Sequence, residues 1–192
     1  APTGAPAVGR PPVRQSELLR LNADTLAVEA RVTPAAAPGR TGRDGQPQDG
    51  GVFAVYGVGV DDANDTVWVS NSRQNTVAVY RQSDLSLVRQ FEPGTVNHAR
   101  DVVIDEEHGK AYASATFEPE VVVFDTAALT VAKRIKIDST VRGETFSAAS
   151  VSYDREARRL YVASNSTNEV AVIDAAADTV LNVFPVPGAR SV

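Results

Sequence analysis

Three short segments of the chain carry cationic and aromatic side chains of the kind that bind anions. The candidate ligand-binding residues are His98, Arg100, Arg142, Glu144, Phe146 and Arg190. A guanidinium group donates paired hydrogen bonds to a carboxylate or phosphate, so arginines at one site favour an anionic ligand. His98 could act there as a general base, although a lone loop histidine is more simply explained by local hydrogen bonding. For Arg100 and Arg190, structural pairing competes with ligand contact.

Three aspartates, Asp61, Asp105 and Asp154, could suggest a metal site. The segment from Asp61 to Asp65 superficially resembles a calcium-binding loop, but it lacks the required glycine and terminal glutamate. Because the aspartate recurs just before a predicted turn, we expect its side chain to bond to backbone amides of that turn. We therefore predict no metal site. His108 falls in one of these turns, where we expect it to be solvated.

Other catalytic and cofactor-binding patterns are missing from the sequence. There is no Gly-x-Ser-x-Gly elbow, no phosphate-binding loop and no dinucleotide-binding fingerprint. Cysteine is absent, which excludes disulfides, thiolate catalysis and cysteine-ligated metal clusters. The catalytic residues of any enzyme built on this chain therefore stay unassigned, and we expect no cofactor.

Composition and charge limit the partners of the chain. Its 192 residues are 43% hydrophobic, as in globular proteins, and carry a net charge of −5, so a broad basic surface for DNA or anionic membranes is not expected. No run of 18 apolar residues occurs, and we predict no membrane span. The chain starts at Ala1 and contains no methionine, so we expect an upstream segment to have been removed.

The elements that must position the candidate residues are short strands. From residue 17 onward, Val, Ile, Tyr and Phe alternate with polar residues, and turn-forming residues separate the runs. Self-comparison shows three copies of one unit that align without gaps, preceded by a partial copy. The three copies are 57–91, 101–135 and 150–184. Each holds four strand signals, in the second copy 101–105, 110–115, 120–125 and 130–137. Four antiparallel strands repeated every ~40–50 residues predict an all-β fold, a β-propeller of four-stranded blades.

The repeat also predicts the boundaries of the blades. The expected parts are a mobile Pro/Ala-rich tail (1–16), the outer two strands of one blade (17–32), an exposed Gly/Pro-rich loop and lead-in (33–54), three full blades (55–98, 99–147 and 148–190) and the start of another (191–192). About three and a half blades would leave apolar faces uncovered at both ends. We therefore expect the remaining blades to come from another chain or from further sequence.

Two segments resemble the YVTN-type β-propeller repeat. They are Trp68–Tyr80 (WVSNSRQNTVAVY) and Leu160–Asp174 (LYVASNSTNEVAVID). The chain is similar to the YncE-like extracytoplasmic propellers from about residue 17 to residue 192. The resemblance implies a seven-bladed ring and secretion through a signal peptide that is then removed.

Residues that depart from the repeat are the better functional candidates, because the scaffold constrains every blade alike. His98 precedes an innermost strand, so we expect it at the mouth of the central channel, with the other candidates and Arg40 and Arg43 on the same face. The sequence favours an extracytoplasmic, non-enzymatic binding or scaffold protein with a small anionic ligand or a protein partner at this mouth. One alternative is a periplasmic enzyme, or its scaffold subunit, with catalysis at the same place. Binding of single-stranded nucleic acid is disfavoured, because few aromatic residues are free to stack on bases.

Overall fold

The structure is a computed structural model that describes residues 16–41 and 44–189. Its main part consists of three four-stranded antiparallel sheets. The first contains β5 (Val55–Asp61), β6 (Thr66–Asn71), β7 (Thr76–Arg81) and β8 (Leu87–Gln90). The second contains β9 (Ala99–Asp105), β10 (Lys110–Ala115), β11 (Glu120–Asp125) and β12 (Thr130–Lys136). The third contains β13 (Ala148–Asp154), β14 (Arg159–Ser164), β15 (Glu169–Asp174) and β16 (Thr179–Pro185).

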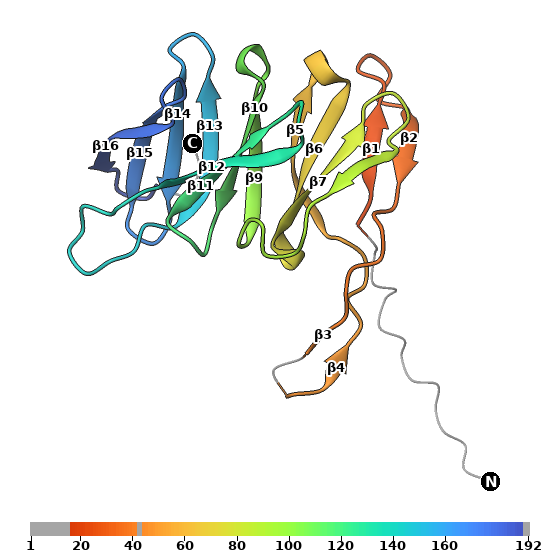
Figure 1. The fold of residues 1–192 in the computed structure, drawn as a ribbon, viewed down its shortest axis with the longest axis horizontal. Helices are drawn as coiled ribbons and strands as arrows, with labels where there is room; N and C mark the ends of the chain where they lie inside the picture. The colour runs from red at the N-terminus through yellow and green to blue at the C-terminus, as the bar shows by residue number, and fades with distance from the viewer. Residues whose placement is uncertain (1–15, 42–43, 190–192) are drawn as a thin grey trace.

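Two smaller sheets precede these three. Strands β1 (Leu18–Leu21) and β2 (Val28–Val32) form a two-stranded sheet that packs beside the first four-stranded one. Strands β3 (Arg40–Thr41) and β4 (Pro47–Gln48) form a short hairpin that projects from one end of the sheets (Figure 1). The predicted exposed loop at 33–54 thus contains a small hairpin of its own. The predicted tail lies outside the described residues, apart from Ser16.

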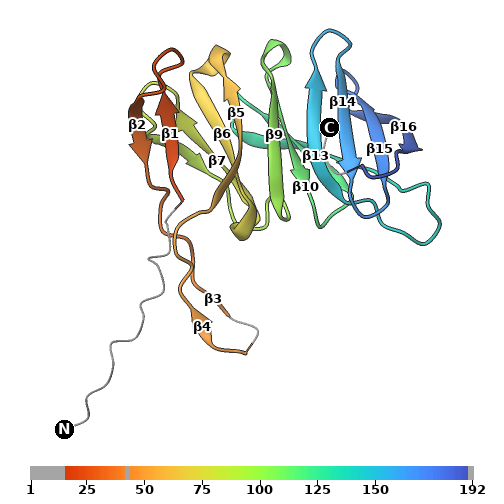
Figure 2. The ribbon, with the colours of Figure 1, turned by 180° about the vertical axis from the view of Figure 1, so that it is seen from behind.

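The four-stranded sheets stand side by side like the blades of a propeller. Each blade places its first strand innermost, and β9 contacts both β5 and β13. Figure 2 shows these three inner strands next to one another. The predicted fold class, all-β with four-stranded antiparallel blades, is confirmed, and β1 and β2 form the partial blade.

The backbone repeats along with the sequence. The turn between the third and fourth strands places one residue in the left-handed region in every blade, the partial one included. These residues are Leu26, Leu85, Leu129 and Asp178, with φ between 52° and 57°. Leucine rarely adopts this conformation. Because leucine nevertheless adopts it at three of these four turns, we infer that the two strands joined by each turn impose the turn geometry.

The hydrophobic core lies between the blades. Trp68 of the first blade packs on Phe91 and on Phe124 of the second, with ring centroids 6.0 and 5.4 Å away. Tyr112 and Leu160 belong to the corresponding cluster between the second and third blades. Each blade is therefore apolar on both faces and needs a neighbour on each side.

Two glycines of β5 allow the inner strands to approach closely. A Cβ atom on Gly57 would lie 2.1 Å from the carbonyl oxygen of Arg100, and one on Gly59 would lie 2.9 Å from that of Val102. Both obstacles are backbone atoms, which cannot move aside as a side chain could. The close spacing of β5 and β9 therefore requires residues without a Cβ atom, that is glycine, at positions 57 and 59.

Replacing Gly57 by alanine should separate the first two blades. We expect Gly57→Ala to lower the free energy of unfolding by about 1–3 kcal/mol, the usual cost of overpacking. Chemical denaturation followed by the fluorescence of the single tryptophan measures it. Val58→Ala, at an exposed neighbour on the same strand, is the control and should cost less than about 1 kcal/mol. Equal losses in the two variants would contradict the close-approach argument.

Candidate functional site

A cleft of about 660 Å³ opens at the end of the blades from which the β3–β4 hairpin projects. Its walls come from the start of β5, the short turn η2 (Ser72–Gln74), the start of β9 and the turn between β10 and β11. The lining residues are Ala54, Val55, Tyr56, Ser72, Arg73, Asn75, His98, Arg100 and Phe117. At this end the chain returns from an outer strand to the next inner strand, so residues from two blades meet.

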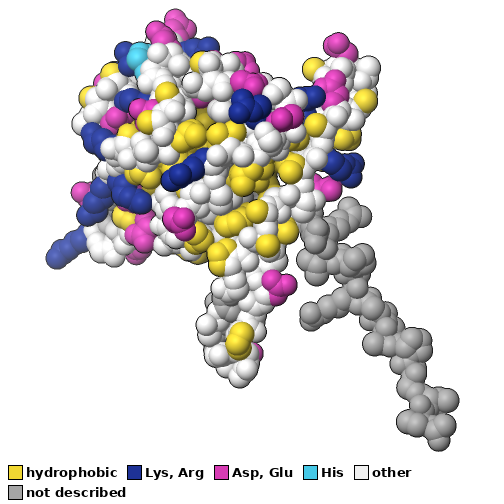
Figure 3. Space-filling view, turned by 45° about the vertical axis from the view of Figure 1, so that its right-hand side comes forward, with side chains coloured by type: hydrophobic (Ala, Val, Ile, Leu, Met, Phe, Trp, Pro, Cys, Tyr) yellow, Lys and Arg dark blue, Asp and Glu magenta, His cyan; other side chains and the backbone are white. Residues whose placement is uncertain are grey.

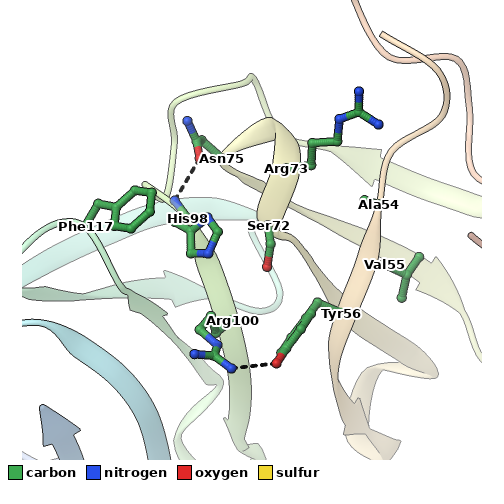
Figure 4. Close-up of a pocket in the computed structure, with 9 residues that line it drawn as sticks. All are labelled: Ala54, Val55, Tyr56, Ser72, Arg73, Asn75, His98, Arg100 and Phe117. Carbon is green, nitrogen blue, oxygen red and sulfur yellow. Dashed lines mark hydrogen bonds between the residues drawn. The ribbon is translucent and has the colours of Figure 1, made fainter. Parts of the chain in front are cut away.

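Arg100 is held over an aromatic ring at the side of the cleft. Its Nη2 donates a hydrogen bond of 2.6 Å to the hydroxyl oxygen of Tyr56, and its guanidinium carbon lies 5.1 Å from the centre of that ring. Figure 4 shows the two side chains pointing toward each other from β9 and β5. The stacking fixes the guanidinium plane and leaves its other N–H groups available to a ligand.

His98 is fixed by its backbone and by its ring. Its backbone is left-handed, with φ at 51°, and its amide donates a 2.8 Å hydrogen bond to Asn75 Oδ1. The imidazole stacks on Phe117, with 4.3 Å between centroids and 19° between planes (Figure 4). Burial lowers the pKa of His98, and the charge of Arg100 lowers that pKa further, so the imidazole is neutral at pH 7.

The electrostatics of the cleft favour an anion. Arg73 and Arg100 contribute positive charge, and no aspartate or glutamate lines the walls. Neither arginine forms an ion pair with any residue in the described ranges. Arg73 extends from η2 away from Arg100 (Figure 4), so Arg100 and His98 form the more compact pair. Unpaired guanidinium groups beside exposed aromatic rings can bind a carboxylate, phosphate or sulfonate.

Of the five predicted site residues that the structure describes, two line this cleft. His98 and Arg100 do so, whereas Arg142 and Glu144 are exposed in the connection between β12 and β13. Phe146 is buried in the core between the second and third blades, so its position corrects the expectation that it lies at the mouth. It belongs to the same buried cluster as Tyr112 and Leu160 and is not open to a ligand.

Some of the cationic candidates cannot be placed. Arg43 and Arg190 lie outside the described residues, and Arg40 lies in β3 with its side chain undescribed.

Tyr56, Ser72, Arg73, Asn75 and Phe117 line the cleft but were not predicted from the sequence. A signal for three of them was present. Tyr56 occupies the same repeat position as Arg100, and Arg73 the same position as Phe117. Residue type thus changes from blade to blade at these positions, which marks them as free of scaffold constraints.

The predicted turn aspartates have two different roles. Asp61 accepts a hydrogen bond from the Asn64 amide at 3.3 Å, and Asp154 accepts one from the Ala157 amide at 2.9 Å, as predicted. Asp105 is buried and instead pairs with His108 Nδ1 at 3.0 Å. His108 is therefore anchored in its turn and not simply solvated.

Two classes of site can be assessed from the described ranges. Within residues 16–41 and 44–189, no three His, Asp or Glu side chains are grouped as a metal ion would require. The same residues include no helix with the length and hydrophobicity needed to cross a membrane.

The connection that carries Arg142 and Glu144 is anchored by a buried carboxylate. Glu169 accepts hydrogen bonds from Ser139 Oγ at 2.7 Å, from the Thr140 amide at 2.8 Å and from the Thr140 hydroxyl. Burial raises the pKa of Glu169, but hydrogen bonds from Thr140, Thr167 and Ser139 outweigh this effect, and the pKa is lowered overall. The ionised carboxylate therefore stabilises the fold above its unfolded pKa of 4.5.

Comparison with known proteins gives the class of fold. No family model and no curated protein matches the sequence. Among solved structures, hydrazine synthase of Kuenenia stuttgartiensis is similar, with a TM-score of 0.60 and 16% identity over 71% of this chain and 38% of that chain. U3-55K is similar with a TM-score of 0.57 and 10% identity, over 71% of this chain and 41% of that one. Both are β-propeller proteins, and at such low identity the likeness shows the fold alone. The chain spans about two fifths of the length of each.

Replacing Glu169 should destabilise the protein in a pH-dependent way. We expect Glu169→Gln to lower the free energy of unfolding at pH 7 by about 2 kcal/mol, because charge-assisted hydrogen bonds are lost. The lowered pKa means that this contribution is present above pH 4.5 and disappears as the pH falls through the folded value. Denaturant titrations from neutral to acid pH measure the difference. Glu144→Gln, in the same connection, should change stability by less than about 0.5 kcal/mol. A loss that is the same at every pH would contradict the role of the ionised carboxylate.

Proposed function

We propose that this chain is part of an anion-binding propeller that uses the cleft at its channel mouth, and that it serves as a binding module without catalysis of its own. The observation that carries the proposal is the cleft with Arg73, Arg100 and a neutral His98 and without a lining carboxylate. The ligand is a small anion or an acidic segment of a protein partner. Exposed aromatic rings at Tyr56 and Phe117 favour a ligand with an apolar body attached to the charged group.

The proposal also covers the number of blades in the complete protein and its location in the cell. The resemblance of Trp68–Tyr80 and Leu160–Asp174 to the YVTN repeat favours a YncE-like protein with seven blades, exported through a signal peptide into the periplasm or the medium. Among the other predicted candidates that the structure describes, Arg142 and Glu144 lie in an exposed connection and Phe146 lies in a core, which makes these three secondary to Arg100.

Removing the Arg100 guanidinium should weaken anion binding. With benzenesulfonate as the probe, we expect Arg100→Ala to lower the affinity about 10- to 100-fold, the effect of losing charge-assisted hydrogen bonds. Arg100→Lys should give an intermediate loss, because it keeps the charge but not the planar fork. Isothermal titration calorimetry measures all three proteins.

The matched control is Arg155→Ala. Arg155 is an exposed arginine in the turn between β13 and β14, at the opposite end of the blades, and it pairs with Glu106. This variant should bind benzenesulfonate like the unmodified protein. The proposal is wrong if Arg100→Ala also leaves the affinity unchanged, or if both variants lose it equally.

Anion binding should strengthen as the pH falls. Since burial and Arg100 lower the pKa of His98, the ring gains its proton, and a positive charge, only at acid pH. Benzenesulfonate stays ionised throughout, so a rise in its affinity from about pH 7 to about pH 5 reports on the protein. His98→Gln should show a flat profile over this range. A slope that persists in His98→Gln would assign the titration to another group.

A further inference from the structure

A second, smaller pocket adjoins the cleft. It has a volume of about 160 Å³, and its walls come from the segment that carries the β3–β4 hairpin, from η2 and from the connection between β8 and β9. The lining residues are Pro38, Gly39, Gly50, Arg73, Gln74 and Pro93. Arg73 also lines the cleft, so the two cavities share it. Among the described residues, no aspartate or glutamate lines either of them.

The segment around β3 and β4, which we call the hairpin arm (35–41 and 44–53), is fixed at its base. Its two sides are joined by a 2.8 Å hydrogen bond from the Ala37 amide to the Gly51 carbonyl oxygen. Gln74 of η2 accepts a 2.9 Å hydrogen bond from the Ala54 amide and donates one of 3.1 Å to the Val52 carbonyl oxygen. Figure 3 shows the arm standing clear of the blades. The arm therefore forms a fixed wall of the second pocket and extends the site beyond the cleft.

Arg73 provides a second, separate position for a negative group. Its guanidinium group forms no ion pair with any residue of the described ranges. The side chain extends from η2 away from Arg100 (Figure 4) and lines the pocket beside the arm. Arg100 is itself held on Tyr56 by stacking and by a 2.6 Å hydrogen bond. A single small anion bound at Arg100 would therefore leave Arg73 without a partner.

The groups of the cleft that remain free for a ligand are mostly hydrogen-bond donors. They include guanidinium N–H groups and Asn75 Nδ2, whereas Asn75 Oδ1 already accepts a hydrogen bond from the His98 amide. The Tyr56 hydroxyl oxygen already accepts one from Arg100. An acidic peptide segment matches this set, because its carbonyl and carboxylate oxygens are acceptors. A sugar polymer matches it less well, since each of its hydroxyl groups also needs an acceptor.

Charge and apolar surface both favour a peptide over a nucleic acid. Within residues 16–41 and 44–189, the charged side chains that line the two cavities are Arg73 and Arg100, and the whole chain has a net charge of −5. A phosphate backbone is normally followed by a longer row of Lys and Arg. Phe117 in the cleft and Pro38 and Pro93 in the second pocket offer apolar surfaces. These surfaces suit a peptide that has apolar residues beside its acidic ones.

We infer that this site binds an extended acidic segment of a protein partner, which runs from Arg100 past η2 to the pocket beside the hairpin arm. One carboxylate of the segment accepts hydrogen bonds from Arg100, and a second accepts them from Arg73. An aromatic or aliphatic side chain of the segment packs on Phe117, and another packs on Pro38 and Pro93. This inference rests on the proposed function and adds to it a class of partner and a second anion position.

Capped peptides with one or two glutamates test the second anion position. The series carries two glutamates with one, two or three residues between them, one of these a phenylalanine, and so covers separations of roughly 7–13 Å in an extended chain. The reference peptides replace either glutamate by glutamine. At the best spacing, we expect the full chain to bind the two-glutamate peptide at least ~10-fold more tightly than either reference, because a second charge-assisted hydrogen-bonded pair forms. Isothermal titration calorimetry measures these affinities.

Variants at the second pocket should remove or weaken this preference. In Arg73→Ala, the two-glutamate peptide and the better reference should bind within about twofold of each other, because no cation remains for the second carboxylate. Pro93→Glu places a like charge at the exposed wall of the pocket and should weaken the two-glutamate peptide ~3- to 10-fold. The matched control is Arg81→Ala. Arg81 is an exposed arginine at the opposite end of the same blade, where it pairs with Asp65, and its variant should keep the full preference.

Four results would overturn the inference. In the first, benzenesulfonate binds through Arg100 but no spacing gives a preference for two glutamates, so the proposed function stands and the second position is wrong. In the second, Arg73→Ala keeps the preference, with folding verified by circular dichroism. In the third, trigalacturonate or a thymidine oligonucleotide binds more tightly than the best peptide, which would make an acidic polysaccharide or a nucleic acid the occupant. In the fourth, neither benzenesulfonate nor any peptide binds, and the proposed function fails together with this inference.

Discussion

The burial of both faces of every blade is the constraint on which the structure depends. A four-stranded sheet with valine, alanine and aromatic residues on both sides cannot exist alone in water, and it gains stability only when neighbours cover both faces. Trp68 and Tyr112 show this dependence, since each belongs to one blade and is buried completely by contact with the next. Stability is therefore shared between neighbours, as in other repeat architectures.

Contacts between blades also fix the spacing of the inner strands, and through it the shape of the cleft. Gly57 lets β5 lie against β9, and the Ser70 hydroxyl joins the Gly57 amide to the Arg100 carbonyl oxygen. Farther along, Asp101 accepts a 3.2 Å hydrogen bond from the Val151 amide. Tyr56 and Arg100 lie near the starts of these two strands, β5 and β9. The packing of the strands therefore positions the pair that forms one wall of the cleft.

The candidate site lies where the scaffold leaves residue choice open. His98 adopts a left-handed backbone conformation, which Ala54 and Ser147 at the same position before β5 and β13 do not share, and its ring stacks on Phe117. Phe146 illustrates the opposite case, because it also interrupts the repeat pattern but fills a gap in the core. A departure from the repeat can thus serve packing as well as binding. Solvent access decides between the two, and this access depends on the neighbouring blade.

The sequence by itself determined the strands, their order and their pairing within each blade. Alternation of apolar and polar residues and the recurring turns are local properties, so they can be read from a single chain. Only the tertiary structure decided which loop residues share a cleft, because His98, Arg100 and Tyr56 come from two blades whose separation is set by packing. It also decided the difference between Val58 and Val102, which are the same residue type at the same repeat position. Their exposure differs because burial is a property of the neighbour and not of the residue itself.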